Sequence, residues 1–187
     1  KNTKVELNGV LLERGDLYIS RNDNVILKSE FSTEVRLNQE NIKDYAFLLK
    51  EKEIINNFNS MNANLNHILN IRLDNTLKVL DYRYSSKGKI DSFSYNLNKL
   101  KNDFLINDIK SIELNQSDIE INYNSDKNYT LFSKGKYKLN NGNFQNFELT
   151  NNLLKGFNNL DISFETSQEI KIDPINFKKD KDSLAKV

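Results

Sequence analysis

Apolar and polar residues alternate along most of this chain. Between residues 62 and 73, for example, every odd position holds an apolar residue or His67, and most even positions hold Asn. Successive side chains of a β-strand point to opposite faces, so a period of two indicates a strand whose two faces differ. The chain is therefore predicted to build a sheet with one apolar face and one polar, solvated face.

The same period predicts strands along nearly the whole chain. They are expected at Lys4–Val10, Asp16–Ser20 and Val25–Leu37, and then at 62–73, 76–85, 88–97, 103–114, 117–124, 128–139, 142–150, 159–166 and 168–177. Turn-forming Asn, Asp and Gly residues lie between several of these strands, at 21–24, 74–75, 125–126 and 140–142. Short turns join neighbouring antiparallel strands, so the fold class is predicted to be all-β, with an antiparallel meander.

One segment breaks the period of two. Between residues 41 and 58 the apolar residues are three and four positions apart, which is typical of a helix with one buried stripe. These residues are Ile42, Tyr45, Leu48, Leu49, Ile54, Ile55 and Phe58. Asn41 is predicted to be the N-cap, and Asp44 lies in the first turn, where a carboxylate is favourable. We expect a short helical insertion at 41–58, which plugs, caps or pads the sheet.

The length and charge of the chain indicate how many domains it forms and which partners are expected. A chain of 187 residues fits a single β domain, 1–187. It begins at Lys1 without an initiator Met, a signal peptide or a membrane-spanning run, so we expect it to be a fragment of a longer protein. Its 27 Lys and Arg residues nearly balance its 26 Asp and Glu residues, so nucleic acid is not an expected partner.

Residue types that carry out catalysis are scarce. The chain has no cysteine and one histidine, His67, which lies on the apolar side of its predicted strand. Without a second His or a Cys to share a ligand, we interpret His67 as a structural residue. No phosphate-binding loop, calcium loop or nucleophile elbow occurs in the sequence. The chain is therefore not expected to be an enzyme, and catalytic, metal and cofactor sites are all predicted to be absent.

Carboxylates offer a further, weaker hypothesis. Asp103 with Asp108, or Asp118 with Glu120, could pair as the acid and base of a hydrolase that acts on envelope glycans. Asp118 and Glu120 are two positions apart and so share the solvent face of one predicted strand. A solvated face is the favoured interpretation of this pair.

The apolar face is the remaining candidate for function. Its predicted members are Val25, Leu27, Phe31, Val35, Leu65, Leu69, Ile71, Leu73, Ile119, Ile121, Tyr123, Tyr129, Leu131, Tyr137, Leu139, Leu160, Ile162 and Phe164. They form either the interior of a closed β-sandwich or barrel, in a structural or interaction module, or the inner wall of an open trough that contacts acyl chains. Burying a methylene stabilises by about 0.8 kcal/mol, so a tail of about fourteen of them gains on the order of 10 kcal/mol before entropic losses. Periodicity alone favours the closed core.

Three segments carry a short rhythm of Gly, a spacer and an apolar residue. They are Lys87-Gly88-Lys89-Ile90-Asp91-Ser92-Phe93, Ser133-Lys134-Gly135-Lys136-Tyr137 and Gly142-Asn143-Phe144-Gln145-Asn146-Phe147-Glu148-Leu149. With the closing residues 172–179, they make the chain from Leu65 onward resemble the AsmA-like, TamB and YhdP group of bacterial envelope proteins. The resemblance covers about two thirds of the chain.

This resemblance implies a fold and a function. The fold is a long, curved antiparallel sheet with a U-shaped cross-section, the β-taco, in proteins that are anchored in the inner membrane and cross the periplasm. The function is to move phospholipids toward the outer membrane and to support outer-membrane assembly. The implied partners are phospholipid acyl chains and outer-membrane assembly proteins. With strands about 4.8 Å apart, a dozen of them extend such a trough by roughly 55–60 Å.

Overall fold

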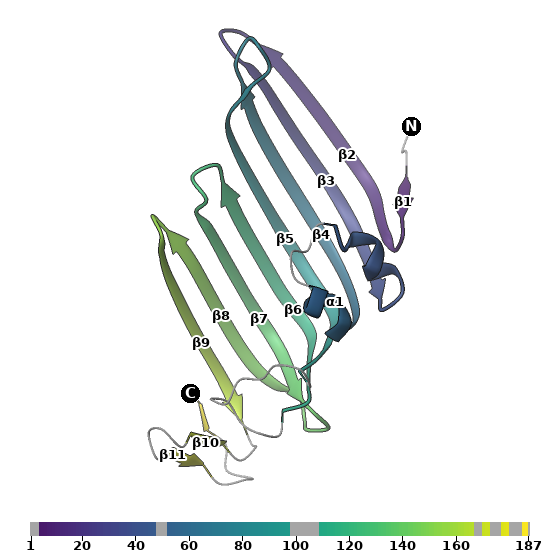
Figure 1. Cartoon of the computed structure of the whole chain (residues 1–187), viewed down its shortest axis with the longest axis vertical. Coiled ribbons are helices and arrows are strands. Elements are labelled where there is room, and N and C mark those ends of the chain that lie inside the picture. Colours follow the sequence, from purple (N-terminus) through teal and green to yellow (C-terminus); the bar gives the residue numbers. More distant parts are fainter. Residues whose placement is uncertain are drawn as a thin grey trace.

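The computed structural model describes residues 4–47, 52–97, 109–166, 170–172, 177–179 and 185–186. Within this part of the chain, strands follow one another in a single antiparallel meander (Figure 1). These strands are β1 (Val5–Leu7), β2 (Val10–Arg21), β3 (Val25–Asn38), β4 (Phe58–Leu73), β5 (Val79–Asn96), β6 (Ser111–Asn124), β7 (Tyr129–Leu139), β8 (Gln145–Leu154) and β9 (Phe157–Thr166). A two-residue strand, β12 (Ala185–Lys186), pairs with the end of β9. Strands β10 (Ile170–Ile172) and β11 (Phe177–Lys179) form a separate hairpin.

The large sheet does not close on itself. Its strand order runs from β1 to β9 and then β12, so β1 and β2 form one edge while β9 and β12 form the other. The prediction of an all-β antiparallel meander is confirmed. The alternative of a closed sandwich or barrel is not what the described strands form, since they contribute one open sheet and one small hairpin.

Two predicted strand breaks are absent from the sheet. The segments predicted at 76–85 and 88–97 form one strand, β5, in which Gly88 continues the strand instead of turning it. A β-carbon on Gly88 would lie 2.0 Å from the carbonyl oxygen of Asn64, so the glycine is required by close contact between strands. The segments predicted at 103–114 and 117–124 likewise meet in β6, where Gln116 bulges with φ of 47°. Residues 103–108 lie outside the described part of the chain.

Near the N-terminus the sheet has a turn that the pattern did not predict. The strand expected at Lys4–Val10 is divided by Asn8 and Gly9, whose φ angles are 43° and 89°. This left-handed pair reverses the chain, so that β1 folds back on the start of β2. The segment predicted at Asp16–Ser20 is the second half of β2, and of the strand predicted at 168–177, β10 and the first residue of β11 are described.

The helical insertion is shorter than predicted. It consists of a 3-10 helix, η1 (Asn41–Tyr45), and a short α-helix, α1 (Lys52–Asn57), and Phe58 already begins β4. The prediction of Asn41 as N-cap is wrong. The N-cap is Glu40, whose side chain makes no capping hydrogen bond. Oδ1 of Asn38, two residues earlier, accepts hydrogen bonds from the backbone N–H groups of Glu40 and Asn41, at 2.8 and 3.0 Å. Asn41 is the first residue of η1, and its side chain donates to the carbonyl oxygen of Arg36 instead.

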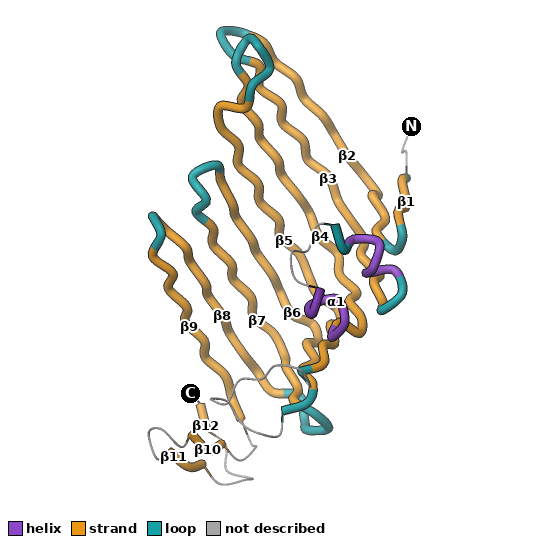
Figure 2. The backbone as a smooth tube through the Cα atoms, in the orientation of Figure 1, coloured by secondary structure: helices purple, strands orange, loops and turns teal. Residues whose placement is uncertain are grey.

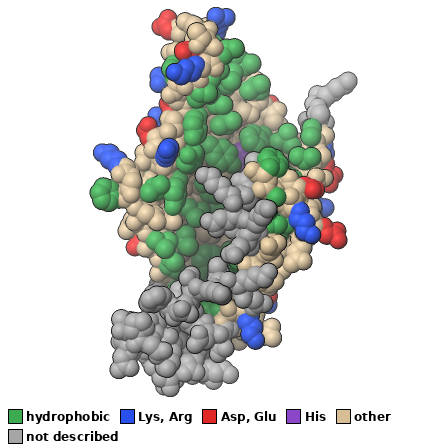
Figure 3. Space-filling model, in the orientation of Figure 1, with side chains coloured by type: hydrophobic (Ala, Val, Ile, Leu, Met, Phe, Trp, Pro, Cys, Tyr) green, Lys and Arg blue, Asp and Glu red, His purple; other side chains and the backbone are tan. Residues whose placement is uncertain are grey.

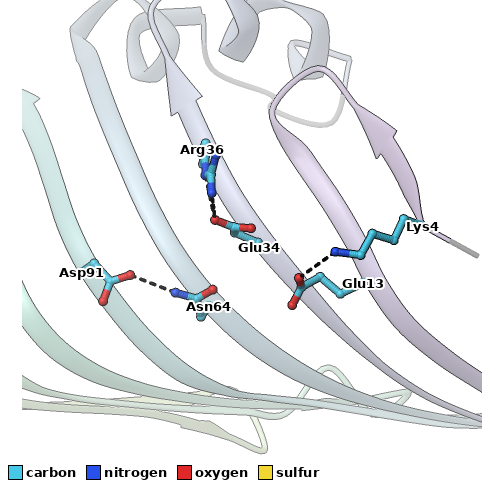
Figure 4. A network of polar contacts seen from close by, with 6 residues as sticks. All are labelled: Lys4, Glu13, Glu34, Arg36, Asn64 and Asp91. Atoms are coloured by element: carbon cyan, nitrogen blue, oxygen red, sulfur yellow. Dashed lines mark hydrogen bonds and ion pairs between the residues drawn. The ribbon is translucent and has the colours of Figure 1, made fainter. Parts of the chain in front are cut away.

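Strand register divides the sheet into two faces of opposite character. On the polar face, side-chain contacts link neighbouring strands or neighbouring positions, as in the Asn64–Asp91 hydrogen bond and the Arg36–Glu34 pair (Figure 4). The other face is apolar across its middle, and charged side chains lie mostly around its border (Figure 3). The two short helical segments lie over one end of the strands (Figure 2). The predicted division into an apolar and a polar face is therefore confirmed.

Candidate ligand-binding face

Strand pairing brings every predicted groove residue to the same face of the sheet. Residues that pair directly across strands share a face, and the pairs can be followed from β2 to β9. One such row consists of Leu12, Thr33, Leu65, Gly88, Ile119, Ser133, Leu149 and Ile162. The next consists of Gly15, Phe31, His67, Ser86, Ile121, Leu131, Asn151 and Leu160. We call this side of the sheet the apolar face.

The predicted residues differ in how accessible they are. Val25, Val35 and Tyr137 are buried by the protein itself, and Tyr137 also donates a 2.7 Å hydrogen bond to the carbonyl oxygen of Glu165. These three residues belong to the packed part of the face. At the other extreme, Leu160 and Ile162 on β9 are 53% and 49% exposed. The remaining candidates range from half-buried to slightly exposed, as expected for the wall of a single layer.

The apolar face also contains residues that the alternation did not indicate. They are Val10, Leu12, Leu17, Ile19, Met61, Tyr82, Tyr84, Ile90, Phe93, Tyr95, Ile112, Leu114, Phe147, Leu149 and Leu153. Leu17, Tyr18 and Ile19 are three apolar residues in succession. The sequence alone therefore does not show whether the odd-numbered or the even-numbered side chains of this strand lie on the apolar face. On β5, Asp91 is an extra residue with no partner on β4, which makes a β-bulge. Before Asp91 the even-numbered side chains of β5 lie on the apolar face, and after it the odd-numbered ones do. This bulge at Asp91 is why the alternation did not place Phe93 and Tyr95 on the apolar face.

One end of the apolar face is covered by the helical insertion. Ile42 of η1, Ile55 of α1 and Phe58 form a buried cluster. Partly buried residues of the sheet pack against this cluster, namely Leu37, Met61, Phe93 and Tyr95. A hydrogen bond of 2.5 Å from Tyr45 Oη to the carbonyl oxygen of Leu7 ties η1 to β1. The insertion therefore caps this end of the face.

A histidine lies at the middle of the apolar face with both ring nitrogens partnered. His67 is buried, and its Nε2 and Nδ1 lie 2.8 Å from Thr33 Oγ1 and Tyr84 Oη. Phe31 stacks on the imidazole with 4.6 Å between ring centroids. Burial lowers the pKa of His67, because the charged ring would be poorly solvated here. These contacts agree with the structural interpretation of this residue.

Small side chains run beside His67 across the apolar face. Ser86, Ser117 and Ser133 are all buried, and Ser117 has no exposed surface. Next to them, a β-carbon on Gly135 would lie 2.3 Å from Ser117 Oγ, and one on Gly88 would lie 2.0 Å from the carbonyl oxygen of Asn64, so both positions exclude a side chain. The bulges at Asp91 and Gln116 lie close to these residues in the sequence. A β-bulge bends its strand, and small residues are needed where bent strands approach one another closely. The buried serines and the two glycines therefore mark positions where neighbouring strands lie too close together for a larger side chain.

Of the candidate carboxylates, Asp118 and Glu120 lie on the opposite, polar face, and Asp103 and Asp108 lie outside the described residues. Glu120 pairs with Lys87 at 3.2 Å, and Asp118 is in register with Lys89 of β5 and Lys134 of β7. The Lys87 ammonium, first by hydrogen bonding, lowers the pKa of the Glu120 carboxyl, which suits a charged surface residue rather than a general acid. The segments Ser86-Lys87-Gly88-Lys89 and Ser133-Lys134-Gly135-Lys136 thus flank β6, with their Ser and Gly residues on the apolar face. Lys87, Lys89 and Lys134 lie opposite acidic residues, and Lys136 lies opposite Asn115 and Asn146.

A shallow hollow of about 510 Å³ lies mainly on the polar face, toward the end of the strands away from the insertion. Its lining includes Ile68, Arg83, Asn122, Asn124 and Leu154. Ile68, Arg83 and Asn122 are polar-face residues by strand register, whereas Tyr84, Tyr123 and Tyr129, which also line the hollow, belong to the apolar face. The hollow therefore involves residues of both faces.

Within the described residues, no group of three or more His, Cys, Asp or Glu side chains is placed to hold a metal ion. No described helix has the length and apolar character needed to cross a membrane. Comparisons with family models, with curated proteins and with solved structures found no match. The apolar face itself is therefore the feature from which a function can be inferred.

Proposed function

We propose that the apolar face holds phospholipid acyl chains, as one section of an envelope protein of the AsmA-like and TamB type. One observation carries the proposal. Away from the insertion, apolar side chains from β2 to β9 share one face, and no second sheet of the described chain covers it. A contiguous exposed apolar surface is unfavourable in water unless something binds to it.

The composition of the uncovered part suits a hydrocarbon guest. Leu, Ile and Phe side chains offer contact without demanding hydrogen bonds, and each methylene transferred from water contributes about 0.8 kcal/mol. Tyr82 and Tyr123 lie at the end away from the insertion, with ring centroids 5.9 Å apart. Tyrosine suits such a border because its ring is apolar and its hydroxyl remains hydrated.

The proposal extends to place and partners. The chain is a periplasmic section of a protein whose inner-membrane anchor lies elsewhere in the full-length polypeptide, and outer-membrane assembly proteins are its partners. The polar face, with its lysine and glutamate pairs, faces the aqueous compartment. The insertion closes one end of the apolar face, so that lipid occupies the other part.

Site-specific photocrosslinking tests this function. A photoreactive residue at Leu69 or Ile121 places the probe on the apolar face, and one at Asn70 or Asn122 places it one residue away on the polar face. In cells, crosslinks to phospholipid are expected from the first pair of positions and not from the second. Crosslinks only to protein at Leu69 and Ile121 would identify an interaction module instead. Absence of lipid from both the crosslinked and the purified protein would refute the proposal.

A further inference from the structure

The hollow near the end of the sheet away from the insertion is lined mainly by polar side chains. Its described lining residues come from β4 to β8 and from the turn after β6, and Arg83 is the one charged residue among them. Most of the others carry an amide or a hydroxyl group, and none is Asp or Glu. The volume of about 510 Å³ lies within the range of roughly 300–1,000 Å³ that small-molecule sites occupy.

The charge of Arg83 is only partly compensated by its neighbours. The residue lies on the polar face opposite Asn124 of β6, its side chain is exposed, and it forms no ion pair with a described residue. A hydrogen bond from Ser125 is the main cause that lowers the pKa of Asp81, two positions earlier on the same face. Arg83 and Arg72 lower the same pKa further. One carboxylate is therefore shared by two guanidinium groups.

Three other lining residues use their acceptor atoms within the protein and keep hydrogen-bond donors. Oδ1 of Asn124 accepts from two backbone N–H groups of its own turn, at 3.0 and 3.3 Å. Oδ1 of Asn128 accepts from the backbone N–H of Lys155 at 2.9 Å. Thr130 Oγ1 accepts from Nδ2 of Asn122 at 3.2 Å. The NH₂ groups of the two asparagines and the threonine hydroxyl therefore remain as donors.

The turn after β6 is fixed against β5 beside Arg83. The backbone N–H of Ser125 donates to the carbonyl oxygen of Tyr82 at 3.1 Å, and the Ser125 hydroxyl donates to Asp81 at 2.6 Å. These contacts hold the turn and its amide donors near the guanidinium. Donors that are fixed before a ligand arrives lose little entropy when it binds.

We propose that this hollow binds the phosphate group of a polar phosphoester. The Arg83 guanidinium supplies a charged, two-pronged donor that matches phosphate oxygens. The amide groups and the hydroxyl supply further donors, and no carboxylate in the described lining opposes an anion. Ile68 and Leu154, which are 40% and 53% exposed, offer apolar contact to the rest of the ligand.

Phosphate binding in this hollow does not depend on acyl chains bound elsewhere, because Arg83 lies on the polar face. A soluble phosphoester and a phospholipid headgroup carry the same group. The hollow recognises the chemistry that they share, so the test has to distinguish these two sources.

Titration with glycerol phosphate tests the site. In a proton–nitrogen NMR correlation spectrum, this ligand should shift the side-chain amide signals of Asn124 and Asn128, and glycerol should not. Arg83→Gln should weaken binding about tenfold or more, because it removes a charged hydrogen-bond donor. Arg14→Gln removes an exposed arginine from the polar face of β2, away from the hollow, and should bind as wild type does. Circular dichroism confirms that each variant is folded.

Three results of this titration would overturn the proposal. They are equal binding of glycerol and glycerol phosphate, equal binding by wild type and Arg83→Gln, and no binding by wild type at millimolar concentrations of glycerol phosphate.

Flotation with phosphatidylglycerol vesicles distinguishes the two sources of phosphate. Flotation that is lost in Arg83→Gln and kept in Arg14→Gln would support the site and identify a lipid headgroup as the ligand. Arg83-dependent binding of glycerol phosphate without flotation would support the site and identify a soluble phosphoester. Flotation that persists in Arg83→Gln, together with no response to glycerol phosphate, would overturn the proposal and leave the apolar face as the lipid-binding surface.

Discussion

Tyr84 Oη lies 2.8 Å from Nδ1 of His67, and this contact is part of a chain of polar groups within an apolar surface. Thr33 Oγ1 meets the other ring nitrogen at 2.8 Å. The three side chains come from β3, β4 and β5, so one imidazole links three strands. Because the ring is buried, its partners compensate for the loss of water as hydrogen-bonding partner.

The first prediction concerns pH. Burial lowers the pKa of His67 in the folded state below its unfolded value of about 6.5, so the unfolded chain binds more protons between the two values. The free energy of unfolding should therefore fall as the pH decreases through about 6.5. Below the pKa of His67 in the folded state, protonation of His67 should cause no further decrease. Urea denaturation of wild type and His67→Gln, at pH 7.5 and 5.5, measures the effect. Equal pH dependence in the two proteins would contradict it.

The same substitution should lower stability at neutral pH. His67→Gln removes the ring that stacks on Phe31 and leaves the Thr33 and Tyr84 hydroxyls with changed partners. We expect a loss of about 1–3 kcal/mol at pH 7.5. Gln can still donate and accept, so Leu at this position should cost more. The outcome that contradicts this ordering is a Leu variant as stable as wild type.

Glycine substitutions test the crowding in the middle of the apolar face. Gly135→Ala would place a methyl group 2.3 Å from Ser117 Oγ, and the strands must separate to accept it, at a cost of about 1–3 kcal/mol. Gly15→Ala is the matched control, since its new methyl group would meet nothing closer than Phe31 Cβ at 3.5 Å. Thermal denaturation compares the two. A similar loss in both would show that crowding against Ser117 is not the cause, because the lower unfolded-state entropy of Ala by itself stabilises the folded chain.

Truncation of the insertion tests its role as a cap. Ile55→Ala removes a buried side chain from the cluster with Ile42 and Phe58, and should lower stability by about 2–5 kcal/mol. Phe47→Ala changes a residue that is 82% exposed in the same insertion, and should have little effect. If the insertion were only loosely associated with the sheet, both variants would match wild type in chemical denaturation.

The alternation of residue types was enough to predict the two faces and the order of the strands. In β3 and β4 most apolar positions pair with another apolar or small residue, as Leu27 does with Ile71 and Val35 with Ala63, so the pattern in either strand indicates the same face. The exceptions are Ile26 opposite Arg72, Ile68 opposite Glu30 and Phe31 opposite His67. Turn residues such as Asn140, with φ of 52°, then made sequential hairpins the simplest connection.

The bulges and the accessibility could not be predicted in this way. Asp91 and Gln116 look like ordinary strand residues in the sequence, yet each adds a residue that shifts the inward parity of the rest of its strand. The N-cap is Glu40 rather than Asn41, and the backbone N–H groups of both residues donate to Asn38 Oδ1, which precedes the helical spacing. Val25 and Val35 are buried, whereas Leu160 on the same face is exposed. This difference depends on which neighbouring residues cover each strand, and the alternation does not report it.

The most direct test of the central claim is the amount of phospholipid that copurifies with variants of the apolar face. Leu69→Asp and Ile121→Asp put a charge where acyl chains are proposed to lie, and Asn70→Asp and Asn122→Asp add the same charge one residue away on the polar face. Native mass spectrometry should find lipid on wild type and on the polar-face variants, and should find it greatly reduced on the apolar-face variants. Equal lipid on all five proteins, or none on folded wild type, would contradict the account.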